Sequence, residues 1–332
     1  MTRNLKHRIT IFAGILLLAL LSNHAMAAQP PASQRVVYVG LLLARGGLGD
    51  RSFNDSAYLG LQAAQKQFGI RFETADFSSD AVNLDTLRRF ARQEYDLIMG
   101  IGFENGAYLE TVAQEFPAGR FAIIDTVAKG ENVASIVYRE QEGDFLMGVL
   151  AAMLTKSKKV GIIGGPMYPG MQRIISGFKQ GVAYQDPSVA VVVDLASTYT
   201  DPQVGKALAL KQYQSGVDVI HNACGRTGLG IIEAAKETGK LTTGASGDQR
   251  YLAPGNMVGN RPKRVDTTVL TLVQEVIEGQ FTAGTRSFGL KEEGLSLGPF
   301  DKQLVSDAML KRLETLKQEI LTGKIVVTVP GE

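Results

Sequence analysis

The sequence predicts an α/β protein made of two doubly wound lobes. Continuous apolar segments, such as 36–43, are typical of parallel strands covered on both faces. They alternate with segments whose apolar residues recur at helical spacing, such as 55–68. The alternation starts again near residue 142 and yields a second unit of similar size, without a clear sequence repeat between the halves. At roughly 100–200 residues per domain, 332 residues suffice for two domains.

The first unit runs to residue 138. Its first helix ends at Gly69 and its third at Pro117, because glycine and proline terminate helices. Strands are expected at 36–43, 70–75, 96–101, 121–125 and 133–138. Helices are expected at 55–68, 82–93 and 105–116.

The second unit opens with a helix at 142–155, followed by a basic turn. A tail helix at 305–321, ended by Gly323, and a last strand at 325–329 complete the chain. Between them, strands are expected at 160–163, 189–194, 217–222 and 241–245. Helices are expected at 172–184, 202–213 and 228–238.

Residues 1–27 have the pattern of a secretory signal peptide. Residues 1–8 are basic, residues 9–21 are apolar, and the small residues at 25–27 match a signal-peptidase site. The apolar run has 13 residues, fewer than the ~20 needed to span a bilayer. We therefore expect cleavage after Ala27 and a soluble periplasmic protein. The cleavage region has no cysteine, so no lipid anchor is expected.

The mature sequence argues against several classes of function. Its single cysteine, Cys224, excludes an intramolecular disulfide, and a net charge of +2 for the whole chain gives no reason to expect a nucleic-acid partner. Of three histidines only His221 lies beyond the signal peptide, so no Cys/His zinc site is expected. No dinucleotide fingerprint follows the first strand, and phosphate-binding-loop and hydrolase motifs do not occur. We expect no catalytic set, no metal and no cofactor.

Polar residues cluster in the glycine-rich segment that follows the first strand. Asp50, Phe53 and Asn54 offer an acceptor, an aromatic face and an amide at the start of a helix. Open α/β sheets bind ligands beyond the carboxyl ends of their strands, which is where this segment lies. A turn with Asn54 or Asp55 as the helix N-cap explains one polar residue but not the cluster. The segment therefore favours a ligand site.

Seven motifs in order resemble those of the basic membrane protein family, the purine-nucleoside receptors of ABC importers. The first is Gly-Asp-Arg-Ser-Phe-Asn-Asp-Ser at 49–56. The others lie at 100–103, 121–125, 142–148, 159–165, 225–236 and 263–266. The resemblance covers nearly the whole mature chain.

This resemblance implies the fold of type I periplasmic binding proteins, in which two α/β lobes joined by three crossings close on a ligand. It places 36–138 and 256–290 in the N-terminal lobe, and 139–255 and 291–330 in the C-terminal lobe. It also implies a monomer without enzymatic activity. Such a protein binds a small purine-like molecule and delivers it to the permease and ATPase of an importer in the inner membrane.

The resemblance further implies which residues surround the ligand. Phe53 would stack on a planar ring, and Asp125 would accept its N–H groups. Gly225 would let the backbone approach the ligand. Lys263 would reach a carbonyl or hydroxyl, although it is otherwise read as a surface charge between Arg261 and Arg264. The positions carried over are Asp50, Phe53, Asn54, Asp125, His221, Gly225, Ser246, Asp248 and Lys263.

Two positions depart from the family pattern. The family often has Phe where this chain has His221, which either stacks on the ring opposite Phe53 or is structural. It usually has an acid where this chain has Ser246, and serine cannot match the charge-assisted bonds of a carboxylate to ribose. The expected ligand is a purine nucleoside, a purine base or a related heterocycle. A receptor for a sugar or another small metabolite, and a sensory ligand-binding module, are the alternatives.

The serine at position 246 generates a prediction about the ligand. A hydrogen bond to a charged group contributes roughly 1.5–3 kcal/mol, against about 1 kcal/mol for a neutral one. A purine base should therefore bind at least as tightly as its nucleoside, and Ser246→Asp should restore a nucleoside advantage of roughly tenfold. Titration calorimetry with adenine, guanine, hypoxanthine and their nucleosides measures this. Nucleoside binding without base binding would contradict it and would point to Asp248 as the ribose ligand.

Overall fold

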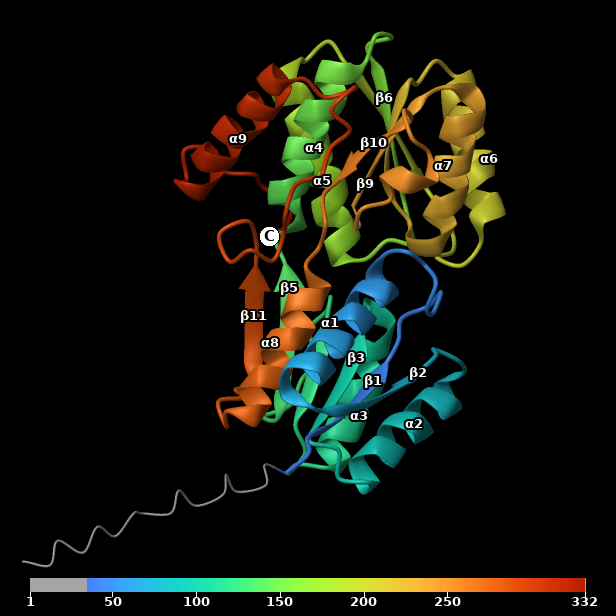
Figure 1. Cartoon of the computed structure of the whole chain (residues 1–332). Helices are drawn as coiled ribbons and strands as arrows, with labels where there is room; N and C mark the ends of the chain where they lie inside the picture. The colour runs from blue at the N-terminus through green and yellow to red at the C-terminus, as the bar shows by residue number, and fades with distance from the viewer. Residues whose placement is uncertain (1–34, 246, 332) are drawn as a thin grey trace, which may run out of the picture. The chain divides into compact units, whose positions relative to one another are not determined.

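The computed structural model describes residues 35–245 and 247–331, which form two α/β lobes (Figure 1). The first lobe contains a parallel sheet with the strand order β2-β1-β3-β4-β5-β11. Neighbouring strands are in direct register, with Val39 of β1 opposite both Phe72 of β2 and Leu97 of β3. The strands are β1 Tyr38–Leu42, β2 Arg71–Ala75, β3 Leu97–Ile101, β4 Phe121–Ile124, β5 Val133–Tyr138 and β11 Gly284–Phe288.

The second lobe repeats this arrangement with a parallel sheet in the order β7-β6-β8-β9-β10. In both sheets the first strand of the lobe lies between the second and the third, so each sheet has a switch point beside its first strand. Ligands of doubly wound sheets bind at such points. The strands are β6 Lys159–Gly164, β7 Ala190–Leu195, β8 Val219–Ala223, β9 Leu241–Gly244 and β10 Met257–Asn260.

Helix pairs cover both faces of each sheet. In the first lobe α1 packs against α8 and α2 against α3, and in the second lobe α4 packs against α5 and α6 against α7. The helices are α1 Phe53–Phe68, α2 Asp80–Arg92, α3 Gly106–Glu115, α4 Glu140–Leu154, α5 Pro169–Gln185, α6 Pro202–Gln214, α7 Gly228–Thr238, α8 Val265–Ile277 and α9 Asp307–Leu321. Three short 3-10 turns lie at η1 Phe103–Asn105, η2 Gly225–Thr227 and η3 Arg250–Leu252.

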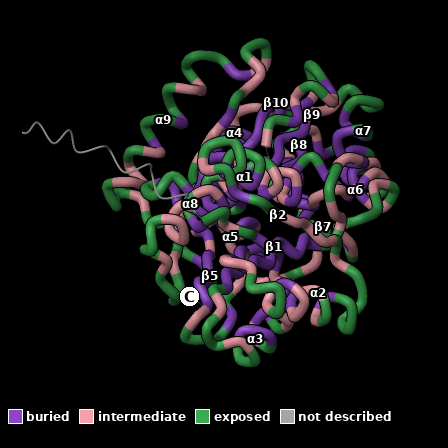
Figure 2. The backbone as a smooth tube through the Cα atoms, turned by 60° about the horizontal axis from the view of Figure 1, so that its bottom comes forward, coloured by how far each residue is buried: buried purple, intermediate pink, exposed green. Residues whose placement is uncertain are grey.

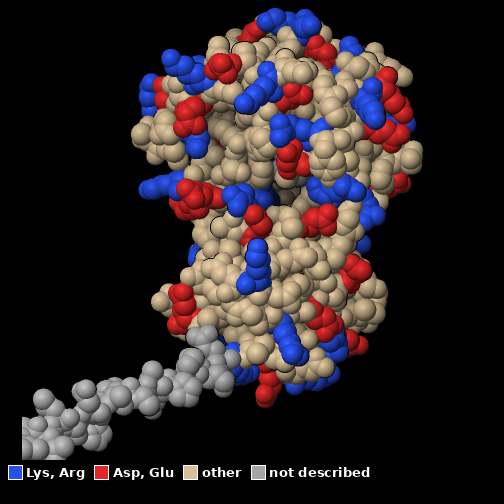
Figure 3. Space-filling model, viewed as in Figure 1, with Lys and Arg blue, Asp and Glu red and all other residues tan. Residues whose placement is uncertain are grey.

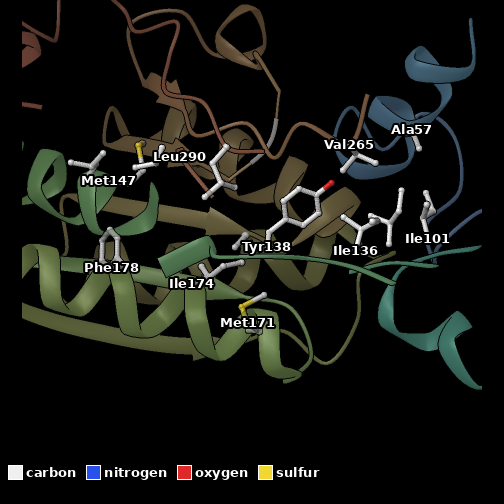
Figure 4. Close-up of a cluster of buried hydrophobic side chains, with 14 of the residues drawn as sticks. Ala57, Ile101, Ile136, Tyr138, Met147, Met171, Ile174, Phe178, Val265 and Leu290 are labelled. Atoms are coloured by element: carbon white, nitrogen blue, oxygen red, sulfur yellow. The ribbon is translucent and has the colours of Figure 1, made fainter. Parts of the chain in front are cut away.

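The largest apolar core is continuous through both lobes. It joins Ile101 and Ile136 of the first sheet to Met147 of α4 and Phe178 of α5 (Figure 4). Figure 2 shows the buried segments on the inside and exposed turns around them. Helices α4 and α5 approach closely, because a Cβ added at Gly148 would lie 2.1 Å from a carbonyl oxygen of α5.

A buried ion pair lies beside the crossings between the lobes. Arg261, which follows β10 on the way to α8, directs Nη2 to Oδ2 of Asp144 at 2.6 Å. His221 Nε2 contacts the other oxygen of Asp144 at 2.9 Å, and its Nδ1 contacts Thr243 Oγ1 at 2.8 Å. All three charged or titratable side chains are fully buried. This ion pair therefore attaches the segment between β10 and α8 to the buried face of α4.

The sequence predicted most elements within a few residues, and the exceptions have physical causes. No strand forms at 325–329. Instead, the carbonyl of Thr328 accepts hydrogen bonds from Ser176 and Gln180 side chains of α5, so this tail pairs with a helix rather than a sheet. Strands β10 and β11 and helix α8 were not predicted. Because β10 pairs with β9, residues 256–260 lie in the second lobe, not in the first as expected.

The predicted signal peptide and the tether that follows it lie outside the described residues, as does Ser246. In the described part of the chain, no helix combines the length and apolar character needed to cross a membrane.

The Asp144–Arg261 pair predicts a large stability effect. Asp144→Ala leaves a guanidinium buried without its carboxylate, and breaking such a pair costs about 3–5 kcal/mol. Urea unfolding followed by circular dichroism measures the loss. Lys158→Ala is the control, because it removes an exposed ion pair with Asp186 and should change the free energy of unfolding far less. Equal losses in the two variants would contradict the assignment of Asp144 as a central contact.

Candidate functional site

A cavity of about 100 Å³ lies between the lobes, at the carboxyl ends of strands from both sheets. In the first lobe it is bounded by residues that follow β1, β3 and β4, and in the second by residues that follow β6, β8 and β9. The two switch points therefore face each other across it. Figure 3 shows the molecule hollowed between the lobes, with charged side chains of both signs around the hollow.

The start of α1 forms one wall of the cavity. Asp50 accepts hydrogen bonds from the backbone N–H groups of Ser52 (2.8 Å) and Asn54 (2.9 Å), which are among the unpaired donors at this end of α1. Asn54 donates to Asp50 at 2.9 Å and accepts from the Ala44 N–H at 2.8 Å, which ties α1 to the end of β1. Burial raises the pKa of Asp50 above its ordinary value, although these bonds oppose the shift. Both side chains line the cavity and also build its wall.

A buried lysine occupies the junction of the crossings. Lys263 Nζ contacts Asp125 Oδ1, and it donates to Glu140 Oε1 at 2.8 Å. Burial lowers the pKa of Lys263, but the two carboxylates outweigh it and leave the pKa above its ordinary value. The ammonium also lies 5.7 Å from the ring centre of Phe53 and 5.0 Å from that of Tyr138. It is therefore a fixed buried cation and not a surface charge.

Asp125 has a strained backbone at the end of β4. Its φ is +86°, which residues other than glycine rarely adopt. Its N–H continues the ladder by donating to Ile136, while Lys263 and the Tyr168 hydroxyl, at 2.7 Å, hold the carboxylate. Such strain persists only where the surroundings fix it, and it is concentrated at functional sites.

Three aromatic side chains that the sequence analysis did not single out also line the cavity. Phe103 comes from the first lobe, and Tyr168 and Tyr199 come from the second. Phe103 and Tyr168 are stacked, with ring centres 4.7 Å apart and an angle of 13°. Burial, reinforced by Asp125, raises the pKa of Tyr168 well above its ordinary value, so the phenol stays protonated and donates. The signal available in the sequence was their position just after a strand.

Hydrogen bonds also join the lobes around the cavity. Arg226 Nη2 donates to the Leu48 carbonyl at 2.7 Å. Arg51 Nη1 donates to the Tyr251 hydroxyl at 2.7 Å, and Gln249 Nε2 donates to the Arg51 carbonyl at 3.0 Å. With the Tyr168–Asp125 contact, these bonds hold the lobes in a closed arrangement.

The structure brings six of the expected residues to the cavity: Asp50, Phe53, Asn54, Asp125, Gly225 and Lys263. Their contact with a ligand stays a prediction. Gly225 begins η2 with φ +54°, where a side chain would be strained. Ser246 is not described, although its neighbours Ala245 and Gly247 line the cavity.

Two expected site residues lie elsewhere. His221 was expected either to stack on the ligand or to be structural. It is fully buried, lies outside the cavity lining and stacks on Phe178 with ring centres 5.2 Å apart, which agrees with the structural interpretation. Asp144 explains this, because it draws the imidazole into the interior. Asp248 does not line the cavity either. Its carboxylate is 42% exposed and pairs with Arg250 at 2.8 Å, which lowers the pKa of Asp248.

The charged residues around the cavity are balanced in number, with three basic and three acidic side chains. Burial raises the pKa of Glu104, as it does that of Asp50. No group of acidic, His or Cys side chains suited to a metal ion occurs in the described part of the chain. The charged lining residues are Arg45, Arg261 and Lys263 against Asp50, Glu104 and Asp125.

Two parallel α/β lobes that close on a cavity at their facing strand ends define the class of periplasmic-type solute-binding proteins. A family model described as "ABC transporter substrate-binding protein PnrA-like" matches residues 37–329. A solved ABC transporter solute-binding protein from Aeropyrum pernix is 30% identical, with a TM-score of 0.82 over 89% of this chain and 94% of that one.

Relatives found by sequence agree with the match to the family model. The CD4+ T-cell-stimulating antigen of Listeria monocytogenes is 32% identical over 317 residues, with 87% of each chain covered. Basic membrane protein A of Borreliella burgdorferi is 29% identical, with 86% of each chain covered. The chain belongs to the Bmp family of ABC transporter substrate-binding proteins. This family comprises solute-binding proteins, which are not a class of enzymes.

One relative bears on the expected absence of a lipid anchor. A protein of Pyrococcus furiosus that is 32% identical, with 80% of this chain covered, is named as a lipoprotein. The expectation for this chain rests on residues that the structure does not describe, so it stays a prediction.

The position of Phe53 generates a prediction about binding. If a flat ring stacks on Phe53, Phe53→Ala should cost ~1–3 kcal/mol of binding free energy, as for stacked bases. Calorimetric titration with the tightest-binding purine measures this. Phe121→Ala, in the core of the same lobe, is the control. It should lower the unfolding temperature more than Phe53→Ala does, and it should reduce the affinity for the ligand less. Unchanged affinity in a destabilised Phe53→Ala variant would make Phe53 a core residue only.

Proposed function

We propose that this protein receives a neutral, flat, purine-like heterocycle and delivers it to the membrane subunits of an ABC importer. The observation that carries the proposal is the convergence of four aromatic side chains from both lobes on one charge-balanced cavity. Stacking on such rings favours planar ligands without regard to their exact substituents. The four are Phe53, Phe103, Tyr168 and Tyr199.

The balance of charge supports a neutral ligand. The lining carries three basic and three acidic residues, so a phosphate or carboxylate brought into the cavity would meet no excess of positive charge. An unpaired buried charge is costly, which argues against nucleotides. Asp125 and Lys263, both held by protein partners, offer an acceptor and a donor to the ligand edge.

Capture follows from the closed arrangement of the lobes. Arg226, Arg51 and Gln249 form bonds that exist only when the lobes meet. A ligand that contacts both lobes binds the closed form better than the open form, and so shifts the population towards it. In our proposal the closed, loaded monomer is soluble in the periplasm, carries no lipid, and docks on the permease, whose ATPase drives uptake.

The proposal predicts a defined selectivity. Hypoxanthine, adenine, inosine and adenosine form the test panel, and at least one should bind with micromolar affinity or better. Inosine monophosphate should bind at least about tenfold more weakly than inosine, because its charge is unmatched. Ribose and glucose are the controls for the sugar-receptor alternative. Calorimetry with the mature protein measures the affinities for the purines and for the sugars, and mass spectrometry identifies any ligand released on denaturation. Sugar binding without purine binding would overturn the proposal.

A further inference from the structure

One guanidinium nitrogen of Arg261 has no hydrogen-bond partner among the residues that the structure describes. The side chain is fully buried and belongs to the cavity lining. Its Nε and Nη2 face the two oxygens of Asp144 at 3.3 and 2.6 Å. Among the described residues, Nη1 has no hydrogen-bond acceptor, although it is shielded from solvent. Buried donors in native proteins are almost always satisfied, so this nitrogen needs an explanation.

The surroundings fix the guanidinium in place. Asp144 is itself held by His221, which is anchored by Thr243 on one side and stacked on Phe178. Gly143 leaves room for the Arg261 stem, because a Cβ there would lie 2.6 Å from Cδ. The position of Nη1 is thus set before any ligand arrives, which lowers the entropic cost of binding to it.

The chemistry of Nη1 determines what can satisfy it. It carries two N–H donors and no acceptor, and its charge is already matched by Asp144. A carbonyl oxygen can accept one of these hydrogens and brings no hydrogen of its own. A hydroxyl would bring a proton of its own, and the oxygens of Asp144 are already engaged by His221 and Arg261. An amino group only donates and is repelled.

We propose that Arg261 binds a carbonyl oxygen of the ligand and selects 6-oxopurines over 6-aminopurines. Hypoxanthine and adenine share one ring system and differ at position 6, where one has an acceptor and the other a donor. The inference rests on the proposed function and specifies its ligand. Arg261 acts here as a residue that determines specificity, in addition to its contact with Asp144.

Calorimetric titration of the mature protein with hypoxanthine and adenine tests the proposal. The wild type should bind hypoxanthine at least about tenfold more tightly. Arg261→Lys keeps a cation beside Asp144 but removes Nη1, the nitrogen proposed to bind the carbonyl oxygen. The variant should therefore have reduced affinity for hypoxanthine and nearly unchanged affinity for adenine. Arg264→Lys is the matched control, because Arg264 makes the same forked contact with Asp266 in the same segment but does not line the cavity.

A folding defect must be separated from a binding defect. The unfolding temperature of Arg261→Lys is measured beside its affinities, and a double variant, Asp144→Asn with Arg261→Gln, removes both charges together. Each folded variant that lacks the guanidinium should lose the preference for hypoxanthine. A crystal structure with hypoxanthine should place its oxygen within hydrogen-bond distance of Nη1.

Several results would overturn the inference. Adenine binding as tightly as hypoxanthine, a preference that survives Arg261→Lys, or only an ordered water at Nη1 in the complex would each do so while leaving the proposed function intact. Absence of binding by every purine and nucleoside in the panel would overturn the proposed function, and this inference with it.

Discussion

The ion pair between Asp144 and Arg261 is the contact on which the arrangement of the lobes and the cavity depends. Arg261 lies in a segment that crosses from one lobe to the other, and Asp144 lies in the first turns of a helix that begins at another crossing. Two buried charges are tolerated only when each is matched and hydrogen-bonded. Their pairing fixes the register of the crossing segment and hence the position of Lys263, two residues further on.

Lys263 forms a second set of buried ion pairs, which connects the second lobe to the first. It joins Asp125, at the end of a first-lobe strand, to Glu140, at the start of the second-lobe helix α4. Burial raises the pKa of Glu140, and the nearby ammonium of Lys263 opposes this shift. The junction of the lobes is therefore built from alternating charges inside an apolar core. Such a junction is specific in geometry, yet it leaves the weaker contacts around the cavity free to open and close.

The sequence predicted the fold well because buried parallel strands are continuous apolar runs, and the helices between them have clear ends. The rule that ligands bind beyond strand ends also located Asp50, Phe53 and Asn54 at the cavity, and the family resemblance located Asp125 there. Contacts between residues far apart in the chain could not be predicted from such local patterns in the sequence. Arg261 looks like part of a basic surface stretch, and only the fold shows that it meets Asp144, 117 residues earlier. The strand expected at 325–329 failed for the same reason, since its partner is a helix.

The position of His221 bears on what we propose the site to recognise. The resemblance to the basic membrane protein family implied an aromatic ring at this position, available to pack on the ligand. Here the imidazole turns inward to Asp144, and the carboxylate in turn holds Arg261 beside the cavity. In our proposal the site therefore has one ring fewer for stacking and one fixed hydrogen-bond donor more. Stacking tolerates many flat rings, whereas a fixed donor requires an acceptor at one place. We therefore expect these three residues together to favour a ligand with an acceptor at one place. A change at any one of them should alter the contacts of the other two, because Asp144 bonds to both His221 and Arg261.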